Sequence, residues 1–106
     1  MPKFLVQISY TTEGVRGLQK EGGTARRAAA QKLVESVGGK LEAFYFAFGA
    51  ADVIAIADVP DNVAAFATAL ATVVTGTVKS QTTVLVTPEE VDQAAKKAVS
   101  FRPAGG

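Results

Sequence analysis

The sequence of 106 residues predicts an α+β fold with the element order β-α-β-β-α-β and a further helix at the C-terminal end. Four segments alternate side chains with the period of a strand. Two longer segments repeat apolar residues every three to four positions, as helices do. A glycine turn at residues 49–51 joins the second and third strands. This is the ferredoxin-like plan, in which a four-stranded antiparallel sheet carries two helices on one face.

The first half of the chain predicts one strand and one long helix. The strand covers Phe4–Tyr10. Residues 11–23 contain several glycines and are expected to form an exposed, mobile connection with a short helical turn at most. The helix begins after Thr24, the expected N-cap, and ends at Gly38, which suits the left-handed position that follows a helix.

The middle of the chain predicts a hairpin followed by a helix. The strands cover residues 40–48 and 52–58, and the apolar run 53–57 indicates a strand buried on both sides. Asp61 or Asn62 is the expected cap of the next helix. Its inward stripe is expected to be the large apolar side chains, with alanine and threonine facing solvent or another subunit: Val63, Phe66, Leu70, Val73 and Val74.

The last part predicts the fourth strand, residues 78–87, and a third helix with a specific start. Thr87 is the expected N-cap, Pro88 suits the first helical position, and Glu90 closes a capping box. The helix is expected to reach about residue 100. We therefore predict a single domain over residues 1–100 and a tail over 101–106. The expected inward residues of the helix are Val91, Ala94, Ala95, Ala98 and Val99.

Composition narrows the function. The net charge of +1 argues against a nucleic-acid partner. The chain contains neither cysteine nor histidine, so we expect no disulfide, no metal site and no cofactor. No apolar run is long enough to span a membrane and no signal peptide is recognisable, so we expect a cytoplasmic protein without a membrane partner.

The second face of the sheet predicts assembly. Strand parity places six apolar residues on the face that the helices leave bare, which is a large patch for a monomer. We expect another subunit, or the C-terminal helix, to cover it, and therefore a homo-oligomer. The six residues are Leu5, Leu41, Tyr45, Val53, Ala55 and Leu85.

Four residues are candidates for ligand binding: Tyr10, Arg16, Tyr45 and Asp52. Asp52 follows the glycine turn, where it is either a general base or amine ligand, or a turn residue that accepts backbone hydrogen bonds. Arg16, near Tyr10 at the end of the first strand, either binds an anion or forms a surface ion pair with Glu13 or Glu21.

Two further segments are weaker candidates. Residues 22–27 begin a helix with two glycines and two arginines, a setting that attracts anions but is also explained by a flexible loop and a cap. Tyr45 shares strand parity with a set of polar residues that line either a pocket or a subunit interface: Gln7, Ser9, Lys79, Gln81 and Thr83.

From residue 3 to 92 the chain resembles the GYD-domain family of the dimeric α+β barrel group. The residues that carry the resemblance are 10–16, Gly38-Gly39-Lys40, Phe44-Tyr45, Gly49 with Asp52 and the following apolar strand, Pro60-Asp61, and Val84 to Pro88. The tyrosine of the family's Gly-Tyr-Asp motif is replaced by Ala51. The resemblance implies a fold and an assembly more directly than a reaction. Gly-x-x-Asp turns of this kind also resemble those of effector-binding domains in feast/famine-type regulators.

These observations predict a homo-oligomeric module that binds a small molecule or has a regulatory role. Two alternatives stay open. The first is a cofactor-independent monooxygenase or isomerase, as in other members of the dimeric α+β barrel group, which requires Tyr45, Asp52 or Glu42 as the proton-transfer group. The second is a structural protein whose alanine-rich helices pack into a larger assembly.

Overall fold

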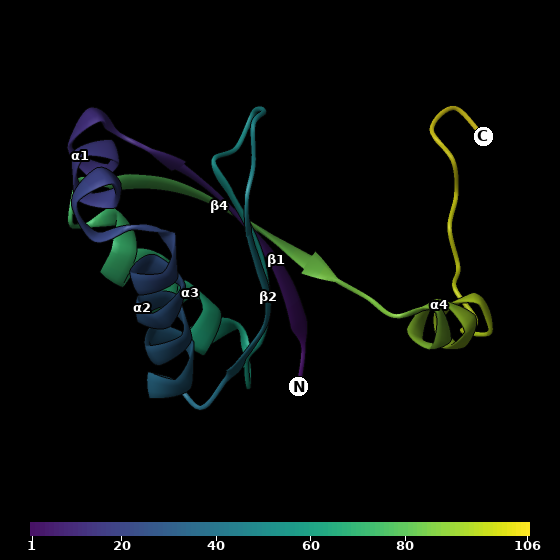
Figure 1. Cartoon of the computed structure of the whole chain (residues 1–106). Helices are drawn as coiled ribbons and strands as arrows, with labels where there is room; N and C mark the ends of the chain where they lie inside the picture. Colours follow the sequence, from purple (N-terminus) through teal and green to yellow (C-terminus); the bar gives the residue numbers. More distant parts are fainter.

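The computed structural model describes the whole chain, residues 1–106, and has the predicted ferredoxin-like α+β fold. One antiparallel sheet has the strand order β2-β3-β1-β4, and three helices lie on one of its faces (Figure 1). The strands are β1 Lys3–Tyr10, β2 Lys40–Phe46, β3 Val53–Asp58 and β4 Val78–Leu85. The helices are α1 Thr12–Glu21, α2 Gly23–Ser36, α3 Asn62–Val73 and α4 Pro88–Ala95.

Helix α1 occupies the segment for which the sequence predicted an exposed connection, and that prediction was wrong. Thr11 caps the helix by accepting a hydrogen bond from the Gly14 amide at 3.3 Å. Gly14 is buried, and a Cβ atom there would lie 2.1 Å from the Thr77 carbonyl oxygen. The glycine that lowers helix propensity therefore allows the helix to approach the start of β4.

Helix α2 follows directly, with Gly22 rather than the predicted Thr24 at its N-cap. Gly22 has φ 88, a left-handed conformation that glycine adopts without strain. At the other end Gly38 has φ 82, as predicted. The amide of Gly38 donates to the Glu35 carbonyl and that of Gly39 to the Val34 carbonyl, which is a Schellman-type termination.

A bulge in β2 decides which side chains share a face. The β2–β3 register shifts between Leu41 and Ala43, so two residues of β2 occupy one step of the ladder around Glu42. Leu41 is therefore paired with Ala57 on the helix side, and the prediction that placed it on the bare face was wrong. Beyond the bulge, Phe44 and Phe46 share the helix side, with ring centroids 5.5 Å apart.

Strand β3 also faces opposite to the prediction. Val53, Ala55 and Ala57 point toward the helices and are at most 6% exposed, whereas Ile54 is 37% exposed on the other face. Small side chains on the helix side allow α2 and α3 to pack closely. Within this chain β3 is thus buried on one side only, not on both. The main core cluster comprises Phe4, Val34, Ala57 and Val59.

Helix α3 is rotated relative to the prediction. Asp61 caps it, as predicted, by accepting a 2.8 Å hydrogen bond from the Ala64 amide. Its sheet-facing side consists of alanine and threonine, including Ala65 and Thr72, which line the same space as Ser80 and Thr82 of β4. The large apolar residues face outward; we call them the α3 stripe, together with the exposed Ala67 that lies among them: Val63, Phe66, Ala67, Leu70, Val73 and Val74.

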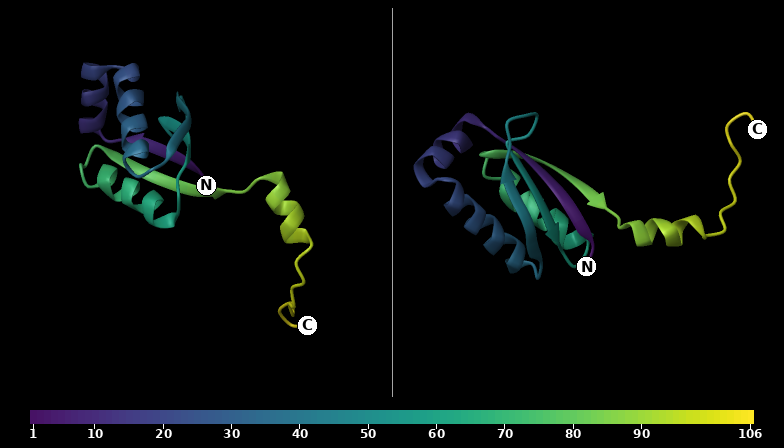
Figure 2. Two further views of the ribbon diagram at one scale, coloured as in Figure 1. Left: turned by 90° about the horizontal axis from the view of Figure 1, so that it is seen from below. Right: turned by 45° about the vertical axis from the view of Figure 1, so that its right-hand side comes forward.

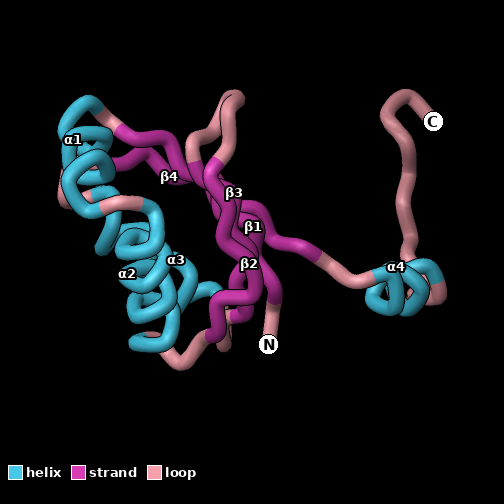
Figure 3. Tube along the Cα trace, in the orientation of Figure 1, coloured by secondary structure: helices cyan, strands magenta, loops and turns pink.

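The face of the sheet opposite the helices has no cover within the chain, and we call it the open face (Figure 3). Register places on it the apolar residues Leu5, Ala43, Tyr45, Ile54, Ile56 and Leu85. It also carries the predicted polar set, because Gln7 pairs with Gln81 and Ser9 with Lys79.

Residues 86–106 form a C-terminal arm that leaves the body of the protein. Figure 2 shows α4 beyond the end of β4, on the side of the sheet away from α1–α3. The radius of gyration is 16.9 Å, compared with about 13 Å for a compact domain of this length. The predicted capping box of Thr87 and Glu90 is present, but α4 ends at Ala95 rather than near Ser100, and every residue of the arm is exposed.

None of the helices is both long and apolar enough to cross a membrane.

Candidate functional site

A narrow apolar cleft lies between the helices and the covered face of the sheet. Its inner part, which we call the inner cleft, has a volume of about 80 Å³. It exists because the residues that meet there are small, such as Ala30 on α2, Ala69 on α3 and Ala55 on β3. Larger residues, including Val6, Leu33 and Phe44, complete its wall.

The cleft widens where β1 ends and β4 begins, and we call this wider part the cleft mouth. It has a volume of about 310 Å³, at the lower end of the range for ligand pockets. The two parts share several lining residues, so they form one continuous space: Ile8, Ala30, Leu33, Phe44 and Thr72. Threonine and serine hydroxyls occur along both parts, and the lining of the mouth adds further polar side chains: Tyr10, Arg26, Thr75 and Thr77.

Arg26 is the only charged residue that lines the cleft. It lies in the first turn of α2, and its Nη1 atom is 3.2 Å from Glu21 Oε2 at the end of α1. Both side chains are more than a third exposed, so the ion pair contributes less than about 1 kcal/mol to stability. A ligand carboxylate can therefore replace Glu21 at little cost, and the guanidinium can donate two parallel hydrogen bonds to it.

Tyr10 lies at the cleft mouth, and Asp52 holds its backbone in place. The Tyr10 amide donates to Asp52 Oδ2 at 2.8 Å, and the Asp52 amide donates to the Ile8 carbonyl at 2.8 Å. The Ala47 amide donates to the Asp52 carbonyl across the hairpin. Asp52 thus extends the hydrogen bonding between β1 and β3 past the last paired residues. Its carboxylate contacts backbone, and it is not among the residues that line the cleft.

The other two predicted site residues lie elsewhere. Arg16 is exposed on α1, outside the lining of the cleft, and Glu21 pairs with Arg26 instead. Tyr45 is 70% exposed on the open face of the edge strand β2. Of the four candidates, the structure therefore brings only Tyr10 to the cleft, and Tyr10 meets Asp52 through its backbone.

Arg26 was not among the predicted ligand residues, although the sequence contained a signal for it. Arg26, Ala30 and Leu33 recur at the spacing of one helix face, and Leu33 continues the apolar stripe of α2. Arg27 lies off that face and is exposed. The position on the helix face therefore distinguishes Arg26, which faces the cleft, from Arg27. The prediction of an anion-attracting segment over residues 22–27 treated the two arginines alike.

The open face carries a second, shallower hollow of about 280 Å³. It lies between the polar residues of β1 and β4 and the hairpin between β2 and β3, where Ser9 Oγ is 3.5 Å from the Ala50 carbonyl. Ala51 lines this hollow and is 8% exposed. The lining is mainly polar: Gln7, Ser9, Ala50, Ala51, Lys79, Ser80 and Gln81.

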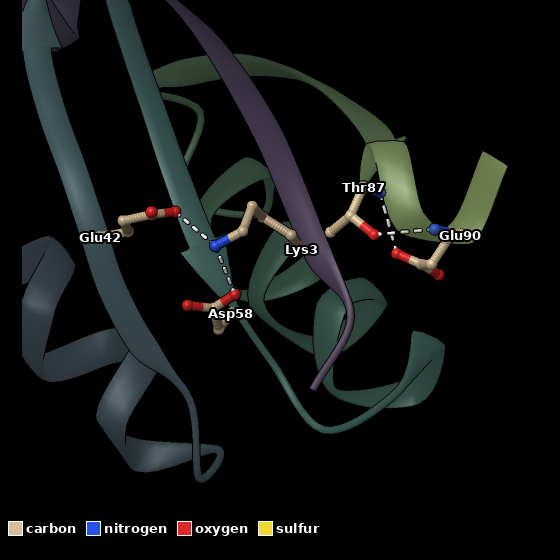
Figure 4. Close-up of polar contacts among 5 residues, drawn as sticks. All are labelled: Lys3, Glu42, Asp58, Thr87 and Glu90. Carbon is tan, nitrogen blue, oxygen red and sulfur yellow. Dashed lines mark hydrogen bonds and ion pairs between the residues drawn. The ribbon is translucent and has the colours of Figure 1, made fainter. Parts of the chain in front are cut away.

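Near the N-terminus, the open face carries a three-residue ionic network. Lys3 Nζ lies 2.5 Å from Glu42 Oε2 and 2.8 Å from Asp58 Oδ1 (Figure 4). The hydrogen bond that Lys3 donates to Asp58, followed by the one that it donates to Glu42, raises the pKa of Lys3 above its ordinary value. The network links β1, β2 and β3 at the end of the sheet remote from the cleft mouth. The structure contains no group of three metal-ligating side chains.

The fold and the cleft define a small α+β protein of the ferredoxin-like class with a pocket between its helices and its sheet. The sequence model of the GYD domain matches residues 4–95, so the chain belongs to the GYD-domain family. Searches of curated proteins and of solved structures returned no match.

Proposed function

We propose that the protein is a homo-oligomeric small-molecule-binding module whose ligand is a compact, mainly apolar molecule with one anionic group. The observation that carries this proposal is a single continuous space with an apolar inner end and Arg26 at its mouth. An apolar wall with a few placed polar groups is the usual composition of a ligand pocket. The apolar part of the ligand would enter between α2, α3 and the sheet, and its anion would replace Glu21 on Arg26.

The open face supports the oligomeric part of the proposal. Its apolar side chains include Ile54 at 37% exposure and Tyr45 at 70%, and nothing in the chain covers them. A second copy that packs its own open face there would bury both patches at once, as sheets pack about 10 Å apart. The ligand site lies on the opposite side of the sheet, so each subunit would retain its own cleft.

Calorimetric titration with octanoate and with 1-octanol tests the ligand class. The two probes have the same chain length, but only octanoate carries an anion. We expect the wild-type protein to bind octanoate more tightly than 1-octanol. Arg26→Gln should weaken octanoate binding by about tenfold, equivalent to about 1.4 kcal/mol, and leave 1-octanol binding unchanged.

Arg16→Gln is the matched control, because it removes the same charge from an exposed site outside the cleft. The proposal is wrong if Arg26→Gln binds octanoate as tightly as the wild type, or if Arg16→Gln causes an equal loss. Equal binding of octanoate and 1-octanol by the wild type would also contradict an anionic ligand.

A cofactor-independent enzyme is the second candidate, and the position of Tyr10 favours it. Among the residues that line the cleft, Tyr10 carries the phenolic hydroxyl, a group type that serves in proton transfer in enzymes. A ligand recovered from the host would be incubated in air with the wild type and with Tyr10→Phe. Conversion of the ligand by the wild type alone would favour the enzyme, whereas an unchanged ligand mass in both would favour the binding module.

A further inference from the structure

We propose that the C-terminal arm is an exchange element, which packs the apolar side of α4 against the α3 stripe of a second copy of this chain. The inference rests on the oligomer proposed above and specifies a contact that the packing of two open faces does not provide. It follows from two apolar surfaces that have no partner within the chain and from the direction in which the arm leaves the body.

The first surface belongs to the arm. Val91, Ala94 and Ala95 lie on one side of α4, and Ala98 and Val99 continue the same spacing past the end of the helix. Val91 is 53% exposed and Val99 is 79% exposed. A helix of eight residues is marginal in water without tertiary contacts. An apolar periodicity that outlasts the helix by one turn indicates that a partner would extend the helix.

The root of the arm is fixed by local structure rather than by contact with the body. The Glu90 amide donates to Thr87 Oγ1 at 3.1 Å, and the Thr87 amide donates to Glu90 Oε1 at 3.0 Å (Figure 4). Pro88 restricts the backbone at the first position of α4. Sequence-encoded caps therefore start the helix at a defined residue, and the helix lies away from α1–α3 (Figure 1).

The second surface is the α3 stripe. Val63 is 78% exposed, Phe66 67% and Leu70 59%, on a helix that contains no charged residue. The stripe runs from residue 63 to 74, about 16 Å along the helix axis, and the apolar side of the arm from 91 to 99 spans about 12 Å. The two lengths are compatible with one helix lying along the other.

Position decides that the partner is a second copy. The arm lies on the side of the open face, and α3 of the same chain lies on the other side of the sheet (Figure 2). A second copy that packs on the open face lies next to the arm. Its open face is then already covered, so the α3 stripe is the large apolar surface that it still offers.

The absence of native cysteine allows a clean crosslinking test of this contact. Full-length Ala95→Cys is mixed with Ala67→Cys, in the middle of the α3 stripe, and the mixture is oxidised mildly. Ala28→Cys is the matched control, because Ala28 is exposed on α2 away from the stripe. Ala43→Cys reports contact with the open face instead. All four substitutions are conservative, and non-reducing gels with peptide mass spectrometry identify the linked pairs.

We expect the Ala95→Cys and Ala67→Cys copies to form a disulfide-linked dimer at a yield at least several-fold above the Ala28→Cys control. A yield equal to that control, or preferential linkage to Ala43→Cys, would overturn the inference. A wild-type protein that is monomeric by light scattering would overturn the oligomer as well. An oligomer without the Ala95–Ala67 linkage would overturn the exchange alone.

Hydrogen exchange tests the same contact in protein that carries no introduced cysteine and no crosslink. We expect the amides of residues 96–100 to exchange slowly in the wild-type oligomer and at least tenfold faster in Leu70→Asp. Leu70 already faces outward, so this substitution should leave the amides of β1 and β3 protected. Unprotected amides at 96–100 in the wild type would contradict a helix that lengthens on the partner.

Discussion

The two faces of the sheet differ most clearly along β3. Toward the helices, Val53, Ala55 and Ala57 are small and almost completely buried. Toward the open face, Ile54 and Ile56 are larger and less buried. Both faces are apolar, so hydrophobicity does not distinguish them; side-chain size does. Small residues allow the helices to pack close to the sheet and leave room for a cleft, whereas the isoleucines are available as contact area for the proposed second copy.

The same division recurs on α3, where alanine and threonine face the sheet and the large apolar residues face away. The body of the protein therefore has an interior of mainly small side chains and two exposed apolar surfaces, the open face and the α3 stripe. This distribution suits a subunit of an assembly better than an isolated domain, because monomers rarely leave large apolar patches uncovered.

The largest effect is expected from aspartate substitutions at two neighbouring residues of β3 that point to opposite faces of the sheet. Val53→Asp places a carboxylate at a site with 0% exposure among apolar atoms, so we expect a loss of more than about 4 kcal/mol, sufficient to unfold a small domain. Ile54→Asp, one position along and 37% exposed, should remain folded and lose self-association. Circular dichroism and light scattering measure the two outcomes. Equal unfolding by both variants would remove the distinction between the faces.

The close approach of α1 to the backbone of Thr77 predicts the second-largest effect on stability. Gly14→Ala places a methyl group 2.1 Å from the Thr77 carbonyl oxygen, and we expect a loss of about 2 to 3 kcal/mol because the carbonyl belongs to the backbone. Gly17→Ala is the matched control in the same helix, where an added methyl group meets nothing within 4 Å. It should stabilise the protein by about 0.5 to 1 kcal/mol. Denaturant unfolding compares them, and similar losses in both would contradict the close contact.

Asp52 links the end of β1 to the hairpin between β2 and β3 and gives the next effect. Asp52→Ala leaves the Tyr10 amide without its 2.8 Å acceptor, and we expect a loss of about 2 kcal/mol with the fold intact. Asp52→Asn retains an acceptor oxygen and should lose less. Denaturant unfolding with an amide spectrum by NMR measures both. Loss of the native spectrum in Asp52→Ala would show that the hairpin depends on this carboxylate entirely.

The smallest effect concerns the ionic network on the open face. Because the folded protein raises the pKa of Lys3, the charged network stabilises the protein below the ordinary lysine pKa of 10.5 and is lost as pH rises through the higher, folded value. We expect Lys3→Met to be slightly less stable than the wild type at neutral pH. This difference should hold up to about pH 10 and then shrink. Urea unfolding at several pH values measures it, and a difference that grows with pH would contradict the sign.

Much of the fold was predictable because local chemistry specifies it. The order of the four strands and of the helices α2, α3 and α4, the Asp61 cap, the left-handed Gly38 and the Thr87–Glu90 capping box all follow from short patterns, and the structure confirms them. The GYD-domain resemblance is likewise confirmed. These features depend on a few neighbouring residues, which a sequence displays directly.

The wrong predictions concern elements with two apolar sides, either of which could face the core. Period-2 parity groups the residues of β3 but does not say which group meets the helices, and the bulge at Glu42 reverses the parity of Leu41. On α3 the larger stripe was assigned inward, although the smaller one fits. The α1 helix was missed because Gly14 lowers helix propensity. Glycine is needed there because the helix approaches the backbone of Thr77, a residue distant in sequence.

The site was predictable only in part, for the same reason. Tyr10 reaches the cleft because it continues the inward parity of β1. The choice between Arg16 and Arg26 depended on the existence of α1, because that helix carries Arg16 away from the cleft and brings Glu21 to Arg26.

Native mass spectrometry of the wild type and of Ile54→Asp, each with octanoate, tests whether the covered face of the sheet holds a ligand while the open face holds a second copy. We expect the wild type to be an oligomer that retains one octanoate per subunit, and Ile54→Asp to be a monomer that still retains one. A monomeric wild type, or an Ile54→Asp variant that remains fully assembled, would contradict the account.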